Sequence, residues 1–121
     1  MTAETLRRVG RTRDIPYLEG RRVMIGGEAV AIFRTERGFA AIGAACPHRD
    51  GPLADGIVSE RCVTCPLHNW RIDLHTGEVV AGGEGAVAVY ELVEREGELY
   101  LRVSAEGEPV ALGGESLRAV A

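Results

Sequence analysis

Two short segments of the chain each combine a cysteine, a proline and a histidine. The first reads Cys-Pro-His over residues 46–48, and the second, sixteen residues later, reads Cys-Pro-Leu-His over residues 65–68. Thiolates and imidazoles are the side chains that bind zinc and iron in proteins. In each segment a strand-like run gives way to turn residues, so we expect two loops that each supply one sulfur and one nitrogen ligand. The candidate ligands are Cys46, His48, Cys65 and His68.

Two metal centres are compatible with this ligand set. A tetrahedral zinc ion takes two cysteines and two histidines, but structural zinc sites usually begin with two ligands separated by two to four residues. The first pair here has one residue between its ligands. A binuclear iron–sulfur cluster relaxes that constraint, because each loop can give its cysteine to one iron and its histidine to the other. Two neutral imidazoles in place of two thiolates raise the reduction potential to roughly −150 to +300 mV. The spacing therefore favours a 2Fe–2S cluster.

The residues around the two segments resemble a Rieske 2Fe–2S domain, and most of all the small subunit of assimilatory NAD(P)H nitrite reductase. The resemblance rests on the run His-Arg-Asp-Gly-Pro-Leu-Ala-Asp-Gly-Ile-Val over 48–58, on His-Asn-Trp over 68–70, and on Asp-Leu-x-Thr-Gly-Glu over 73–78. It covers about residues 5–103. It implies one Rieske-type cluster and a cluster-binding subdomain over about 44–81.

The same resemblance implies a function in electron transfer. The partner would be a large subunit that carries FAD and siroheme and reduces nitrite to ammonium, so the chain would not be catalytic alone. Two alternatives remain open. A Rieske ferredoxin of an aromatic-ring dioxygenase shares the ligand motif and the size, although the Asn69-Trp70 step favours the nitrite reductase subunit. A non-redox interaction domain that holds zinc would be colourless, whereas a Rieske protein is red-brown.

Several neighbours of the proposed ligands also carry expectations. Rieske domains of respiratory complexes join the two loops by a disulfide, at positions that here hold Gly51 and Leu67, so no such disulfide can form. Related domains cover the cluster with a proline-rich third loop, and this chain has Gly-Gly-Glu-Gly over 82–85 instead. Cys62 lies in a strand-like run and is expected to be a small buried residue. His75 is expected at the surface. The docking face for a redox partner is expected to include His48, Arg49, His68 and Trp70.

The elements that position these loops are strands. Two apolar runs flank Gly26-Gly27, and glycine at both central positions of a tight turn predicts a hairpin. Further strands are expected at 6–9, 39–43, 57–58, 62–64, 70–74, 78–80, 87–94 and 98–103. This pattern predicts an all-β protein, an antiparallel Rieske-type sandwich or barrel with an inserted cluster-binding subdomain. We expect one Rieske domain over 1–104 and a partly mobile C-terminal tail over 105–121.

Length and composition limit the remaining possibilities. The chain has 121 residues, enough for one domain, with 45% hydrophobic and 26% charged residues. The net charge of −4 argues against a nucleic-acid partner. No segment has the length of a membrane span, and no apolar stretch follows the arginines of residues 1–14. We therefore expect a cytoplasmic protein with no membrane partner, in which three cysteines indicate metal binding more than disulfides.

Overall fold

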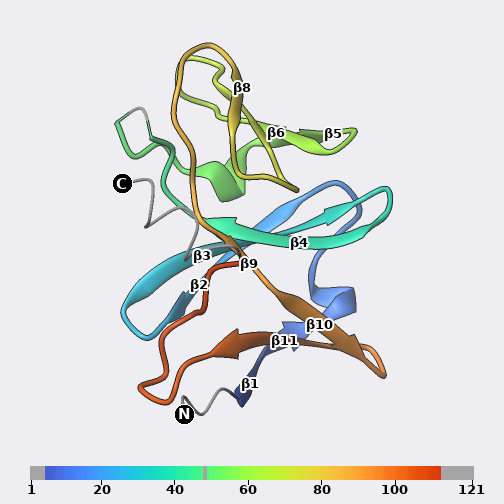
Figure 1. The fold of residues 1–121 in the computed structure, drawn as a ribbon. Coiled ribbons are helices and arrows are strands. Elements are labelled where there is room, and N and C mark those ends of the chain that lie inside the picture. Colours follow the sequence, from blue (N-terminus) through green and yellow to red (C-terminus); the bar gives the residue numbers. More distant parts are fainter. Residues whose placement is uncertain (1–4, 48, 113–121) are drawn as a thin grey trace.

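The protein is built from antiparallel strands, as the sequence predicts, and these strands form three sheets (Figure 1). The structure is a computed structural model and describes residues 5–47 and 49–112. The middle sheet has the order β2-β3-β4-β9, and a second sheet has the order β1-β11-β10. The third sheet has the order β5-β6-β7-β8 and forms the subdomain that carries the candidate ligands. The strands are β1 (Thr5–Arg11), β2 (Gly20–Ile25), β3 (Glu28–Thr35), β4 (Gly38–Gly43), β5 (Ile57–Ser59), β6 (Cys62–Thr64), β7 (Arg71–Asp73), β8 (Val79–Ala81), β9 (Val89–Tyr90), β10 (Leu92–Arg95) and β11 (Glu98–Val103), with short 3-10 turns at Thr12–Asp14 and Leu53–Asp55.

Strand β3 explains why the middle sheet is buried on both faces. Its central residues, 30–33, are at most 1% exposed. Successive side chains of a strand point to opposite faces. Ala31 and Phe33 pack into the apolar cluster that includes the subdomain, whereas Val30 and Ile32 pack against the sheet formed by β1, β11 and β10. The three sheets therefore form three layers, and the continuous apolar run in the sequence reflects burial from both sides.

The subdomain is inserted between two neighbouring strands of the middle sheet. Strand β4 pairs with β9 in the register Ile42 to Val89, and the Gly43 N–H donates to the Ala88 carbonyl at 2.9 Å. The chain leaves the middle sheet after Gly43 and returns to it beside the same strand. Cys46 and Cys65 both lie within this insertion, so the subdomain holds both cysteines that are predicted to bind the metal centre.

Two parts of the chain differ from the sequence-based expectation. The single strand expected over 87–94 is divided at Glu91, because β9 pairs with β4 in the middle sheet and β10 pairs with β11 in the next one. The described part of the expected tail, 105–112, folds back on the base, which consists of the sheets β2-β3-β4-β9 and β1-β11-β10. There the Val110 N–H donates to the Arg102 carbonyl at 3.0 Å, and Ala111 forms a bridge with Tyr90. Residues 113–121 lie outside the described part of the chain. Within the described residues, no helix has the length and apolar character needed to span a membrane.

Candidate metal centre

The first loop of the candidate site follows β4 and contains Cys46. The Cys46 N–H donates to the Gly51 carbonyl at 2.9 Å, and the Asp50 N–H donates to the Cys46 carbonyl at 3.0 Å. Arg49 and Asp50 have φ angles of 61° and 56°, in the left-handed region. These hydrogen bonds close a turn that starts at Cys46 and ends at Gly51.

The second loop, between β6 and β7, repeats this backbone design. The Cys65 N–H donates to the Trp70 carbonyl at 2.7 Å, so in both loops the cysteine N–H binds the carbonyl five residues later. His68 and Asn69 have φ angles of 61° and 60°, at the places that correspond to Arg49 and Asp50. A left-handed conformation costs a residue other than glycine roughly 1–2 kcal/mol. Asp50 and Asn69 belong to the residue types that adopt this conformation most readily, so Arg49 and His68 carry most of this cost.

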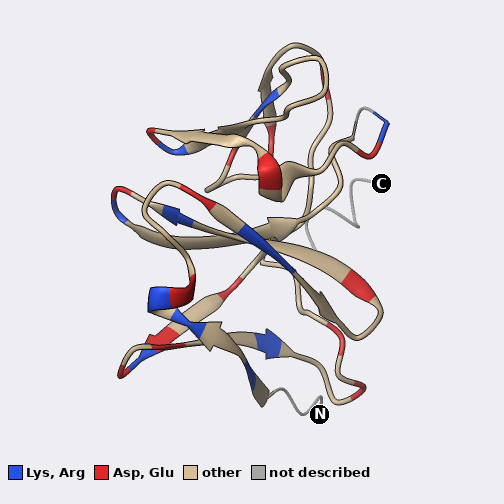
Figure 2. Ribbon diagram, turned by 180° about the vertical axis from the view of Figure 1, so that it is seen from behind, with Lys and Arg blue, Asp and Glu red and all other residues tan. Residues whose placement is uncertain are grey.

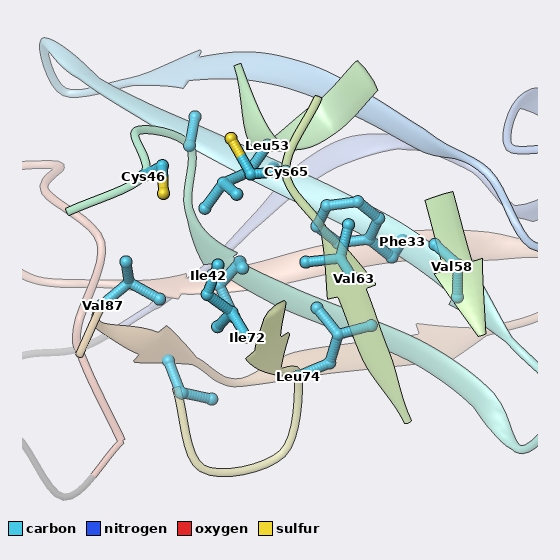
Figure 3. Close-up of a cluster of buried hydrophobic side chains, with 13 residues drawn as sticks. Phe33, Ile42, Cys46, Leu53, Val58, Val63, Cys65, Ile72, Leu74 and Val87 are labelled. Carbon is cyan, nitrogen blue, oxygen red and sulfur yellow. The ribbon is translucent and has the colours of Figure 1, made fainter. Parts of the chain in front are cut away.

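The two loops bring the cysteine side chains into one apolar cluster. Cys46 is 1% exposed and Cys65 is 0% exposed, and Figure 3 shows both sulfur atoms at the same end of the cluster. Gly51 of the first loop makes this approach possible. A Cβ atom at Gly51 would overlap the Cys65 sulfur and would lie 3.4 Å from the Cβ atoms of both Cys46 and Leu67. Glycine is therefore required here because the backbone of one loop passes directly over the thiol of the other.

The position of Gly51 also bears on the absence of a disulfide between the loops. The distance of 3.4 Å between a Cβ atom added at Gly51 and the Leu67 Cβ is near the spacing of a disulfide-bonded pair. The two positions thus lie side by side, as the resemblance implies, but neither holds sulfur. All three cysteines of the chain lie in its described part, and none forms a disulfide.

The donor set of the loops suits a cluster with sulfur ligands on its inner side and nitrogen ligands at the surface. Cys46 and Cys65 are buried, whereas His68 is exposed at the rim of the second loop. His48, the fourth predicted ligand, lies outside the described residues. Within 5–47 and 49–112, no group of three or more His, Cys, Asp or Glu side chains gathers closely enough to hold a metal ion. The assignment of all four ligands therefore stays a prediction.

The third cysteine is not part of this arrangement. Cys62 is 8% exposed and lies on the opposite face of β6 from Val63, which points into the apolar cluster. The Arg71 guanidinium donates a hydrogen bond to the Cys62 sulfur and also donates to Glu60 at 3.1 Å. The hydrogen bond to Cys62, together with the Glu60 carboxylate, raises the pKa of Arg71. Cys62 is thus a small buried residue, as expected.

The run over 73–78, which carries much of the family resemblance, forms a structural turn. The Asp73 carboxylate accepts the N–H groups of His75 and Thr76 at 2.7 and 3.1 Å and the Arg61 guanidinium at 2.9 Å. Partial burial raises the pKa of Asp73, but these donors outweigh it, so the pKa of Asp73 lies below its ordinary value. The side chain of His75 is exposed, as expected.

A feature that the sequence analysis missed is the contact between Trp70 and the third loop. The third loop, residues 82–86, follows β8 and leads toward β9. Its Gly82 and Gly83 lie directly against the Trp70 indole. The signal in the sequence was present, since two adjacent glycines after a short strand permit close approach by a large side chain. Nothing local in the sequence identifies which side chain approaches.

Two buried thiols and an exposed imidazole thus lie on paired loops of an inserted four-stranded subdomain, an arrangement that suits an iron–sulfur cluster. The family model described as the Rieske [2Fe-2S] domain matches residues 5–93. The chain therefore belongs to the Rieske family, carries one Rieske-type 2Fe–2S cluster and functions in electron transfer. Family membership thereby favours the iron–sulfur interpretation over zinc.

Related proteins of two kinds are similar to this chain. The methanesulfonate monooxygenase ferredoxin subunit of Methylosulfonomonas methylovora is 37% identical over 70 residues, which is 57% of each chain. Cholesterol 7-desaturase nvd 1 of Ciona intestinalis is 51% identical over 49 residues, 39% of this chain and 10% of the desaturase. The chain thus spans about a tenth of that desaturase and just over half of the ferredoxin subunit.

Solved structures give the same fold over nearly the whole chain. A chain of the complex of reduced oxygenase and oxidized ferredoxin in carbazole 1,9a-dioxygenase has a TM-score of 0.76 at 25% identity, covering 88% of this chain and 97% of that one. A putative NADH-dependent nitrite reductase small subunit from Mycobacterium tuberculosis has a TM-score of 0.75 at 23% identity, covering 93% and 99%. The all-β Rieske fold is thereby confirmed.

Proposed function

We propose that this protein carries single electrons to or from a larger redox partner, which docks at the end of the subdomain where the two loops lie. The observation that carries the proposal is the difference in exposure within the site, since both thiols are buried and His68 of the second loop is exposed. An exposed imidazole ligand provides the short path between redox centres that electron transfer requires. In this proposal Cys46 and Cys65 bind one iron, and His48 and His68 bind the other.

The surface around His68 suits a protein partner. Leu67 is 41% exposed, and Pro47 and Asn69 are also exposed. Figure 2 shows basic and acidic residues mixed over the described chain. The second loop, 65–70, holds no Arg, Asp or Glu, whereas the first loop holds Arg49 and Asp50 and the third loop holds Glu84. A small apolar surface with a polar rim is typical of a transient interface.

For the partner, we propose the large flavin- and siroheme-containing subunit of an assimilatory NAD(P)H nitrite reductase. The support is the resemblance over 68–70 and 73–78. The second candidate is the oxygenase of a multicomponent system, favoured by 37% identity to the methanesulfonate monooxygenase ferredoxin subunit. We also propose that the protein is cytoplasmic.

Mixing the reduced protein with each purified partner separates the two candidates. In a stopped-flow experiment, the absorbance of the reduced cluster is followed after addition of either the nitrite reductase large subunit or a Rieske-dependent oxygenase. We expect rapid, saturable reoxidation by the nitrite reductase subunit with nitrite present. Rapid reoxidation by the oxygenase alone would assign the protein to the second candidate, and no reoxidation by either would contradict both.

The ligand assignment has matched controls within the chain. Replacing Cys46, His48, Cys65 or His68 by serine is expected to abolish the Rieske absorption and the bound iron and acid-labile sulfide. Cys62→Ser and His75→Ala change the one remaining cysteine and the one remaining histidine, and both should keep a full cluster. A ligand variant that retains the native spectrum, or a control that loses it, would overturn the assignment.

A further inference from the structure

The third loop, residues 82–86, touches both loops of the candidate site. It is anchored to β8 by the Val79 N–H, which donates to the Gly85 carbonyl at 2.9 Å. At Gly85 it approaches the first loop, where an added Cβ atom would lie 3.3 Å from the Pro47 Cβ. At Gly82 and Gly83 it lies against Trp70, which ends the second loop. In Figure 1 the segment from β8 to β9 runs along the end of the subdomain.

The contact with Trp70 leaves no room for a side chain on the third loop. A Cβ atom at Gly83 would lie 2.6 Å from the indole Cε2 and closer still to Cζ2 and Cη2. A Cβ atom at Gly82 would lie 2.8 Å from Cδ1 and 3.0 Å from the Trp70 Cα. The indole therefore rests directly on the backbone of two consecutive glycines. Gly83 has no positive φ, so the indole alone requires glycine at that position.

Trp70 connects this loop to the rest of the site. Its carbonyl accepts the Cys65 N–H at 2.7 Å, and its side chain packs on the apolar cluster that contains both cysteines. One residue thus contacts the second loop, the surroundings of the buried thiols and the third loop. A glycine-rich segment has high conformational entropy when it is not held, so a large rigid side chain is an effective anchor for it.

We propose that Trp70 is a positioning residue that clamps the third loop across the candidate metal site and so limits the access of water to the cluster. The inference rests on the proposed ligand set. It assigns to the indole the closure that a disulfide or a proline-rich loop would otherwise provide. Excluding water lowers the local dielectric constant and disfavours the extra negative charge that reduction adds, so the clamp also lowers the reduction potential.

Gly83→Ala tests the clamp without changing Trp70. The added methyl group must push the indole away from the third loop, at a position whose backbone conformation alanine adopts readily. Gly43→Ala is the matched control, because its nearest atoms, Ala88 N and Val87 Cβ, lie 3.9 Å from the added Cβ and its φ is ordinary. Each variant is purified with its cluster and compared with the wild type.

Three measurements report on the variants. Trp70 is the only tryptophan of the chain, so quenching of its fluorescence by acrylamide measures its exposure directly. Bleaching of the visible absorption by an iron chelator measures access to the cluster. The midpoint potential measures the surroundings of the cluster, and a tenfold change in the reduction equilibrium corresponds to about 59 mV for one electron. We expect Gly83→Ala to increase quenching, to accelerate bleaching and to raise the potential, whereas Gly43→Ala matches the wild type.

Each other result has a defined meaning. If Gly83→Ala and Gly43→Ala behave alike in all three measurements, the clamp is refuted. If quenching increases while bleaching and potential stay unchanged, the role in water exclusion is refuted. If Gly83→Ala does not fold, Trp70→Ala and Trp70→Phe take its place. Trp70→Ala must then bleach faster than the wild type and have a higher midpoint potential, and Trp70→Phe must restore most of both differences. Equal behaviour of Trp70→Ala and Trp70→Phe overturns the proposal. A wild-type protein with no iron or sulfide would refute the proposed ligand set, while fluorescence quenching would still test the contact.

Discussion

Removal of the cluster should release the two loops from each other and leave each loop held only by its own hydrogen bonds. Each loop is closed by hydrogen bonds within itself, at 2.9 Å from Cys46 to Gly51 and at 2.7 Å from Cys65 to Trp70. In the proposed ligand set, the cluster is the covalent cross-link between the two loops. By analogy with a disulfide, linking Cys46 to Cys65 closes a loop of about twenty residues and contributes about 3 kcal/mol.

This magnitude is large against the stability of a single domain, which is about 5–15 kcal/mol. With the usual unfolding entropy for this size, about 3 kcal/mol corresponds to a decrease in Tm of roughly 10–15 °C in the apoprotein. The loss is expected to be local. Hydrogen exchange should accelerate over 44–54 and 62–72, whereas 21–43 and 87–103 keep their protection, because β3 and β4 are buried in two apolar clusters.

Two preparations test the expectation, namely apoprotein made by chelation and the variant Cys65→Ser. Cys62→Ser controls for the cost of placing a serine hydroxyl at a buried position, since Cys62 is 8% exposed and lies outside the site. The melting temperature and the exchange rates are measured for all forms. Equal protection of both loops with and without the cluster, or an unchanged Tm, would show that apolar packing alone holds the loops together.

Individual contacts support three further predictions. Gly51→Ala should lower the iron and sulfide content sharply, because the added methyl group overlaps the Cys65 sulfur. Burial, with Glu28 nearby, raises the pKa of Tyr90 to about 12, against about 10 in the unfolded chain. The folded protein therefore holds the phenolic proton more tightly, so stability is complete below pH 10 and falls by about 2–3 kcal/mol between pH 10 and 12, as urea unfolding would show. The pKa of Asp73 is lowered in the folded protein, so the Asp73 carboxylate stabilises the fold above about pH 4, and this stabilisation is lost as the pH falls. Asp73→Asn should therefore reduce the decrease in unfolding free energy at acid pH.

Each of these predictions has a control and a contradicting result. Gly43→Ala should keep its iron, and normal iron in Gly51→Ala would show that the first loop can move aside. Tyr90→Phe should remove the alkaline decrease, whereas Tyr17→Phe, at a residue 60% exposed, should not. An alkaline decrease that survives in Tyr90→Phe would assign it to another group. Asp55→Asn, at an exposed carboxylate, should leave the decrease at acid pH unchanged, and an identical effect of both Asp variants would contradict the role of Asp73.

The sequence predicts the local parts of the fold well. The glycine pair at 26–27 gives the hairpin of β2 and β3, where Val23 pairs with Val30. The two Cys-Pro steps give two loops with the same backbone design. These features depend on residues close together in the chain, and local turn chemistry and strand periodicity report on such residues directly.

The parts that could not be predicted depend on contacts between distant residues. Nothing near Glu91 shows that the chain passes from one sheet to another there, because residues 87–93 form one run of ordinary strand length that is apolar apart from Glu91. The return of 105–112 is set by hydrogen bonds to Arg102 and Val89, which a fading apolar pattern does not reveal. Gly51 reads as an ordinary turn glycine until the opposite loop is in place. The assignment of His48 and His68 as ligands stays a prediction from spacing.

The insertion of the subdomain between β4 and β9 makes the molecule modular. Its two ends lie side by side, with the Gly43 N–H bound to the Ala88 carbonyl, so the chain enters and leaves the subdomain at one place on the base. A different insert could enter at the same place without changing the strand order of the base, provided its underside covers the apolar face of Ala31, Phe33 and Ile42. Substitutions in the insert can therefore change the redox properties of such a protein, while the packing of the base limits which residues are possible there.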